Sequence, residues 1–235
     1  MPMPSSRPGQ DPVLPNLTPE QVAYWYLRLN GFLLLENFIL HDVRNGGQRT
    51  DADLLGARFR HRREFSFDRA EPMEDDTERL RLSERFDDVV MVEVKTNQPC
   101  TLNGPWTDPD RQNLHRVLAA IGCISQDQVS NVAGRLYAEG VVVHGDRRIR
   151  LIAVGRDHNA ELQAKYSDVV QLTWDDVLTF IWRRLTTFRR QKRDVSQWDR
   201  SGKVLHRLAN RHYGEPVQFI GMVKRAIGVR QAGNT

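Results

Sequence analysis

The sequence predicts an α/β protein built around one mixed β-sheet. Short apolar runs rich in β-branched residues recur along the 235-residue chain, and segments with helical periodicity separate them. The clearest apolar run is VVMVEVK at 89–95, which contains neither glycine nor proline. The order of the expected elements, with strands that follow both turns and helices, favours a sheet that is part antiparallel and part parallel.

A helix and three strands are expected first. Thr18 and Gln21 have capping-box spacing ahead of an apolar stripe, and Gly31 is expected to end this helix. The apolar runs then predict three strands, at 32–40, 49–59 and 88–95. The second and third strands are expected to pair across 60–88, which holds ten acidic residues. We expect 60–88 to be a solvated, charged insertion with a short helix near 77–85.

Two helices and a hairpin are expected next. Apolar residues at helical spacing from 114 to 121 predict a helix that Gly122 ends, and Ser125 is expected to cap another that Gly140 ends. A β-hairpin is expected at 141–155. A last strand at 168–173 precedes a long helix, for which Thr173 and Asp176 supply the cap.

Composition limits the class of protein. The net charge of +4 is mildly basic, and no apolar run is long enough to cross a membrane. Cys100 and Cys123 form neither a disulfide framework nor a paired-cysteine metal motif, so we expect a cytoplasmic protein. We expect a disordered lead at 1–16, an α/β domain at 17–173, and a basic helical extension at 174–235.

The strand at 88–95 places a carboxylate and an ammonium side by side. Glu93 and Lys95 share one face of it, because side chains alternate along a strand, and burial of such groups is costly unless they are paired or bind a metal. Asp53 lies beside them if the second and third strands are neighbours. Two carboxylates and a lysine suit Mg²⁺-dependent phosphodiester cleavage, but a half-buried ion pair would explain the same residues.

These residues resemble the PD-(D/E)xK nuclease superfamily, and most closely its Holliday-junction-resolvase-like branch. The likeness covers about residues 18–122. The motifs that carry it occur in the order that the family shows: Glu20, Tyr26, Leu27, Gly31-Phe32, Asp51-Ala52-Asp53-Leu54-Leu55 and Val92-Glu93-Val94-Lys95. The forty residues from Asp53 to Glu93 exceed the spacing in compact members, because 60–88 intervenes.

The resemblance implies a restriction-endonuclease-like fold with an α-β-β-β-α-β core. It implies a metal, Mg²⁺ or Mn²⁺, held by Asp53, Glu93 and the backbone carbonyl of Val94, with Glu20 assisting. Lys95 would position the attacking water. It implies DNA as the partner, leaves RNA open, and leaves a homodimer open because resolvase-like enzymes often act as dimers. Residues 103–106 follow this strand and are expected to form a turn with a core tryptophan.

The C-terminal part is basic, with thirteen Lys/Arg against four Asp/Glu from Asp176 onward. Six residues could contact phosphates without reading sequence: Arg183, Arg184, Arg189, Arg190, Lys192 and Arg193. A solvated helix face, or attraction to the acidic insertion, would also explain this charge.

A non-catalytic function is the alternative. Two helices and a hairpin at 111–155 fit a winged helix that binds nucleic acid, or a nuclease-like fold could serve for binding alone. Glu20 could likewise only complement the dipole of the first helix.

Overall fold

The computed structural model describes residues 16–41, 46–64 and 73–230. The predicted lead at 1–16 therefore lies outside the described residues, apart from its last residue. In chain order the elements are α1 (Pro19–Leu29), β1 (Leu33–His41), β2 (Gln48–Arg58), β3 (Asp87–Val94), α2 (Gly104–Thr107), η1 (Pro109–Arg111), α3 (Asn113–Ile121), η2 (Gln126–Gln128), α4 (Val129–Glu139), β4 (Val141–His144), β5 (Arg147–Gly155), α5 (Ala160–Lys165), β6 (Val170–Thr173), α6 (Trp174–Thr187), α7 (Arg200–Arg211) and α8 (Pro216–Ala226).

The described strands form one mixed six-stranded sheet, which confirms the predicted α/β class. Its order is β1-β2-β3-β5-β4, and β6 pairs with the second half of β5. β1, β2 and β3 are antiparallel neighbours, whereas β5 runs parallel to β3. The predicted pairing of β2 with β3 is confirmed, since Leu54 lies opposite Val92 and Leu55 opposite Met91.

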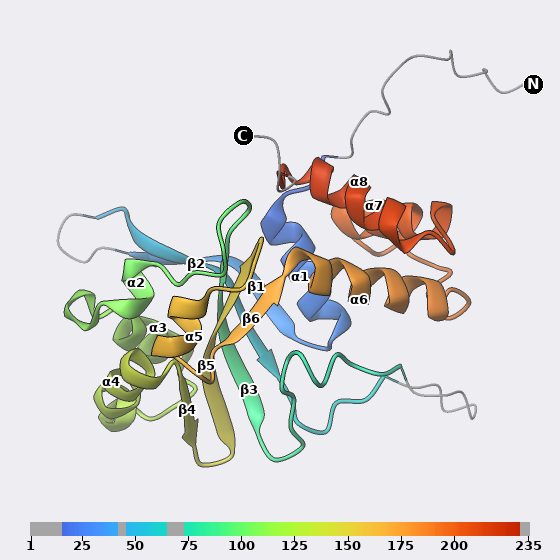
Figure 1. Cartoon of the computed structure of the whole chain (residues 1–235). Coiled ribbons are helices and arrows are strands. Elements are labelled where there is room, and N and C mark those ends of the chain that lie inside the picture. The colour runs from blue at the N-terminus through green and yellow to red at the C-terminus, as the bar shows by residue number, and fades with distance from the viewer. Residues whose placement is uncertain (1–15, 42–45, 65–72, 231–235) are drawn as a thin grey trace, which may run out of the picture.

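Helices cover both faces of the sheet (Figure 1). α1, α6, α7 and α8 pack on one face, where Val90 and Val92 of β3 enter a core shared with Ile181 of α6 and Phe219 of α8. α2, α3, α4 and α5 pack on the other face, against residues such as Met91. Residues of the predicted extension at 174–235 thus complete the hydrophobic core of the sheet.

Most of the predicted helix ends are confirmed. Both capping boxes form, at Thr18 and at Thr173. Gly122 and Gly140 end α3 and α4 in the left-handed conformation that glycine tolerates, with φ values of 63° and 73°. The predicted cap at Ser125 is wrong, because its side chain makes no capping hydrogen bond and a 3₁₀ turn precedes α4.

Residues 73–88 are folded against the core, so the prediction of a solvated insertion at 60–88 is wrong for this described second half. Leu80 is fully buried. Asp76 is buried as well, where it accepts a hydrogen bond of 2.8 Å from the Tyr26 hydroxyl, and its N–H donates to Asn30 Oδ1 over 2.7 Å. The predicted helix near 77–85 is absent; this stretch forms turns before β3.

No helix among the described residues combines the length and the apolar character that a bilayer crossing requires.

Candidate functional site

An irregularity in β1 and β2 positions Asp53. Ala52 packs with the α3–α4 side of the sheet and Leu54 with the α1 side, so the usual alternation of faces breaks at Asp53. Across the strand pair, Asn37 has a positive φ of 50°, a conformation that asparagine adopts more readily than most residues. Because of this break, the Asp53 side chain does not follow the regular alternation between the two faces of the sheet. Asp53 Oδ2 then accepts a hydrogen bond of 2.7 Å from the Val94 N–H of β3.

Glu93 is buried and held by three donors. Its Oε1 lies 2.5 Å from Lys95 Nζ and also accepts from the Asn103 amide. Its Oε2 accepts a hydrogen bond of 2.8 Å from the Trp106 indole. The Glu93 side chain is 5% exposed, so these charge-assisted bonds offset much of the cost of burying its carboxylate. Trp106 is the core tryptophan that the sequence predicts, and its second role is to fix Glu93.

Acidic neighbours shape the electrostatics of the site. The pKa of Asp53 is raised to about 6, first by burial and then by the charges of Glu93 and Glu20, against the lowering effects of the Val94 N–H and of Lys95. Burial raises the pKa of Glu36 on β1, and the charges of Asp199 and Glu20 add to this rise. Negative charge is therefore concentrated at this end of the sheet, where a cation would relieve the repulsion.

The structure brings Asp53, Glu93 and Lys95 together at the end of the β2–β3 pair and places Glu20 within electrostatic reach of Asp53. Val94 takes part through its N–H, which bonds to Asp53.

The donor set fits one divalent cation. Among the described residues no three His, Cys, Asp or Glu side chains are grouped closely enough to hold a metal alone. Asp53 and Glu93 offer two carboxylates, and Mg²⁺ commonly uses one or two of these while it keeps several waters. The hydrogen bond from Val94 engages only one oxygen of Asp53. Three donors occupy three of the roughly four acceptor positions of Glu93, so a metal could bind at the free position of Oε2, or at Oε1 if Lys95 or Asn103 released it.

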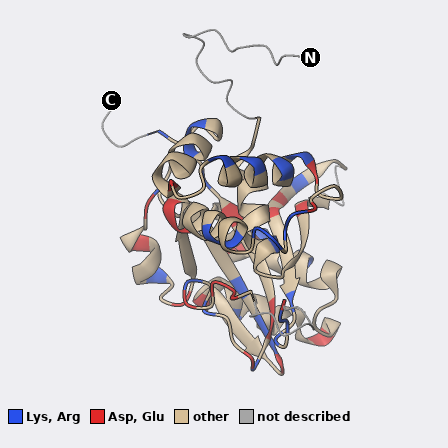
Figure 2. Ribbon diagram, turned by 90° about the vertical axis from the view of Figure 1, so that its right-hand side faces the viewer, with Lys and Arg blue, Asp and Glu red and all other residues tan. Residues whose placement is uncertain are grey.

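The six basic residues predicted to contact nucleic acid have different environments. Arg183, Arg189, Arg190 and Arg193 are exposed, whereas Arg184 and Lys192 are buried. Basic segments of the C-terminal helices lie across the upper part of the molecule in Figure 2.

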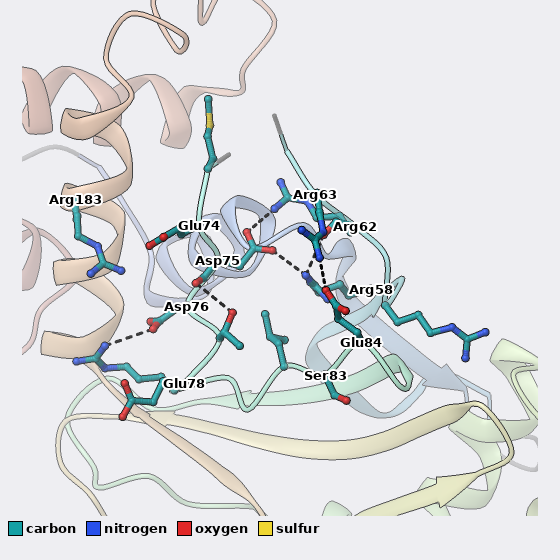
Figure 3. A pocket seen from close by; sticks show the side chains of 15 residues that line it. Arg58, Arg62, Arg63, Glu74, Asp75, Asp76, Glu78, Ser83, Glu84 and Arg183 are labelled. Atoms are coloured by element: carbon teal, nitrogen blue, oxygen red, sulfur yellow. Dashed lines mark hydrogen bonds and ion pairs between the residues drawn. The ribbon is translucent and has the colours of Figure 1, made fainter. Parts of the chain in front are cut away.

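Arg184 and Lys192 are bound by acids of the segment 60–88. Arg184 Nη2 lies 3.1 Å from Asp75 Oδ1, and Lys192 Nζ lies 2.8 Å from Glu64 Oε1. Figure 3 shows Asp75 facing arginine side chains, among them Arg58, whose Nη2 lies 2.8 Å from Asp75 Oδ2. The attraction between the acidic segment and the basic tail thus accounts for these two cations. We therefore restrict the predicted basic surface to its four exposed arginines.

The winged-helix interpretation of 111–155 finds little support in the geometry. A wing projects from its helices, but β5 is an inner strand of the main sheet, between β3 and β4. On the outer side of α4, Arg135 is paired with Glu139 at 3.2 Å. The hairpin is therefore part of the central scaffold.

Comparisons with protein-family models, with curated proteins and with solved structures found no significant match to this chain. The function of the site is accordingly inferred from its geometry and its chemistry.

Proposed function

We propose that the protein is a metal-dependent endonuclease that hydrolyses phosphodiester bonds in DNA with Mg²⁺ or Mn²⁺. The observation that carries the proposal is the convergence of Asp53, Glu93 and Lys95 where the pairing of β2 with β3 ends. The order of the elements supports it: a helix and three antiparallel strands are followed by helices, by β4 and then by β5, which runs parallel to β3. The resemblance to PD-(D/E)xK nucleases implies an α-β-β-β-α-β core.

Asp53 and Glu93 are the residues that would hold the metal, with the Val94 carbonyl, and Glu20 would assist from the first turn of α1. A bound Mg²⁺ or Mn²⁺ would supply Lewis acidity and positive charge at the scissile phosphate. Trp106 and Asn103 keep the Glu93 carboxylate in one orientation in a largely buried setting.

Lys95 is placed to handle the water that attacks the phosphate. Glu93 holds its ammonium in place, and the lysine side chain remains 18% exposed, so it can reach a substrate at the surface. An ammonium there donates hydrogen bonds to the water and offsets negative charge that develops on the phosphate. Arg183, Arg189, Arg190 and Arg193 would contact the DNA backbone.

The first experiment is a cleavage panel of duplex, single-stranded and four-way-junction DNA, and RNA. Each substrate is incubated with Mg²⁺, Mn²⁺ or EDTA. Wild type is compared with Asp53→Asn, and Asp51→Asn on the same strand is the matched control. We expect metal-dependent cutting that Asp53→Asn abolishes and Asp51→Asn retains. Absence of cutting in wild type, or cutting that survives Asp53→Asn, would overturn the proposal.

One observation favours a second candidate function, a nucleic-acid-binding protein without catalysis. Protein donors already engage both oxygens of Glu93, as they would in a purely structural ion pair. This candidate predicts that nucleic acid binds equally well with Mg²⁺ or EDTA, and that no substrate is cut.

A further inference from the structure

A second site lies between α7 and the segment that follows α6. A cavity of about 500 Å³ opens there, and the residues that line it include Arg189, Arg193, Lys203, His206, Arg207 and Asn210. No carboxylate is among the residues that line it. The cavity is therefore strongly cationic.

The cations of this cavity lack acidic partners. Within the described residues, no ion pair joins Arg189, Arg193, Lys203 or Arg207 to a carboxylate, in contrast to Lys192 in the same segment. Four like charges around one hollow repel one another, and a bound anion would relieve that repulsion. His206 and Asn210 are bonded to each other, with Asn210 Nδ2 3.1 Å from His206 Nε2, so the four cations are the groups that would hold an oxyanion.

The row of charges on α7 extends beyond the cavity. Arg200, Lys203, Arg207 and Arg211 follow one another at intervals of three or four residues, so they lie along one side of the helix. Eleven residues of helix span roughly 16 Å, which is too long for a single small anion. One strand of a duplex carries a phosphate about every 3.4 Å of the duplex axis, so the row is long enough to reach several consecutive phosphates.

α7 is firmly attached to α1, the helix that carries Glu20. The Trp25 indole of α1 donates hydrogen bonds to Ser201 Oγ over 2.9 Å and to Asp199 Oδ1 over 3.2 Å. Gly202 permits this contact, because an added Cβ would lie 2.0 Å from the Trp25 ring. The basic row is therefore held in a fixed place relative to the helix that borders the candidate site.

We propose that the cavity and the α7 row form the anchoring site for the phosphate backbone of a nucleic acid. The inference rests on the proposed nuclease function and extends it to residues of α7 that the sequence did not single out. Asp53, Glu93, Glu20 and Glu36 make the candidate site itself repel phosphates in the absence of metal. The attraction that retains the substrate has to come from another surface, and this one has the required charge.

The test is direct binding without cleavage. A short labelled DNA duplex, a single strand and an RNA strand are titrated with protein in EDTA, by fluorescence anisotropy at several salt concentrations. All proteins carry Asp53→Asn. The triple variant Arg193→Gln/Lys203→Gln/Arg207→Gln is compared with Arg135→Gln/Arg156→Gln/Lys165→Gln, which removes the same charge from α4, from α5 and from the residue that follows β5.

We expect the cavity triple variant to bind about 10- to 100-fold more weakly at low salt. Its plot of log affinity against log salt should lose about 2 to 3 units of slope, since each lost phosphate contact removes roughly 0.7 to 0.9. The control should match the parent protein. Vesicles of anionic lipid are titrated in the same way. The inference would be overturned if both triple variants lost affinity for nucleic acid equally, or if the parent protein bound the vesicles and none of the nucleic acids. Thermal melting verifies folding, and Lys203→Arg by itself should leave the affinity of the parent protein unchanged because it keeps the charge.

The two proposals can fail separately. If the parent protein binds nucleic acid and the cavity triple variant does not, but wild type cuts no substrate with any metal, the nuclease proposal is refuted and the anchoring site is retained. Metal-dependent cleavage with binding that the cavity triple leaves unchanged would refute the anchoring site and retain the nuclease.

Discussion

Asp53→Asn should make the metal-free protein more stable, although it removes a residue of the proposed catalytic machinery. The pKa of Asp53 is raised from 3.8 to about 6, first by burial and then by the charges of Glu93 and Glu20. Asparagine retains an oxygen that can accept the Val94 N–H and carries no charge to desolvate. The substitution therefore removes an unfavourable charge and keeps the hydrogen bond.

The magnitude follows from the shift in pKa. A rise of about 2 units corresponds to about 3 kcal/mol between the protonation states. Asp53 is only partly buried, so solvent screening reduces this to about 1–2 kcal/mol. In a chain of this size that is roughly 2–8 °C in melting temperature.

The sign depends on pH. Below about pH 4 the carboxyl is protonated in the folded and unfolded states alike, so it contributes nothing to the difference. As pH rises through about 6, the folded state must also give up the proton, and the destabilisation becomes complete. The advantage of Asp53→Asn should thus be small near pH 4 and full near pH 8.

The assay is denaturant unfolding in EDTA at both pH values, repeated at high pH with millimolar Mg²⁺. Metal should raise the free energy of unfolding of wild type and so reduce the difference in stability between Asp53→Asn and wild type, because binding to the folded state shifts the unfolding equilibrium. The reasoning is refuted if the variant is no more stable than wild type near pH 8, or if its advantage is equal at both pH values. Asp51→Asn serves as the control for loss of a β2 carboxylate.

Three further predictions concern the site and its supports. Lys95→Gln should lower the rate of single-turnover cleavage by about 100-fold or more with substrate binding retained, and an unchanged rate would remove this lysine from the mechanism. Arg184→Met should destabilise the fold by about 3 kcal/mol in chemical denaturation, since it leaves the Asp75 carboxylate, whose side chain is 9% exposed, short of one partner. Loss of the exposed neighbouring arginine in Arg183→Met should change stability by less than about 0.5 kcal/mol. Gly202→Ala should cost about 1–3 kcal/mol because the new methyl group overlaps an indole, whereas Gly221→Ala has room and should be neutral or stabilising, so equal effects would contradict the packing argument.

Local signals predicted most of the fold. Capping boxes at Thr18 and Thr173 depend on residues three apart, and Gly122 and Gly140 end their helices through their own backbone freedom. The grouping of the site residues could also be predicted from the sequence. β2 and β3 are consecutive strands, and their antiparallel pairing brings Asp53 to Val94, next to Glu93.

Long-range contacts account for what the sequence did not reveal. Arg184 and Arg183 are adjacent arginines in one helix, yet only Arg184 is buried, because Asp75 more than a hundred residues earlier lies beneath it. The local sequence could not show which of the two arginines is buried. The burial of Leu80 in a highly charged segment is equally non-local, since it depends on the core that α1 and α6 build.

The layer formed by α6, α7 and α8 has a consequence for synthesis of the chain. One face of the sheet, with Val90, Val92 and Ile152, is covered in part by α1 and otherwise by helices that follow residue 173. A ribosome adds about 5–20 residues per second, so these apolar strands emerge several seconds before Phe219 can reach them. Nascent chains of intermediate length should therefore expose an apolar surface and bind chaperones. Chaperone binding to ribosome-bound chains that are halted before α8 and after α8 would reveal this dependence on chain length.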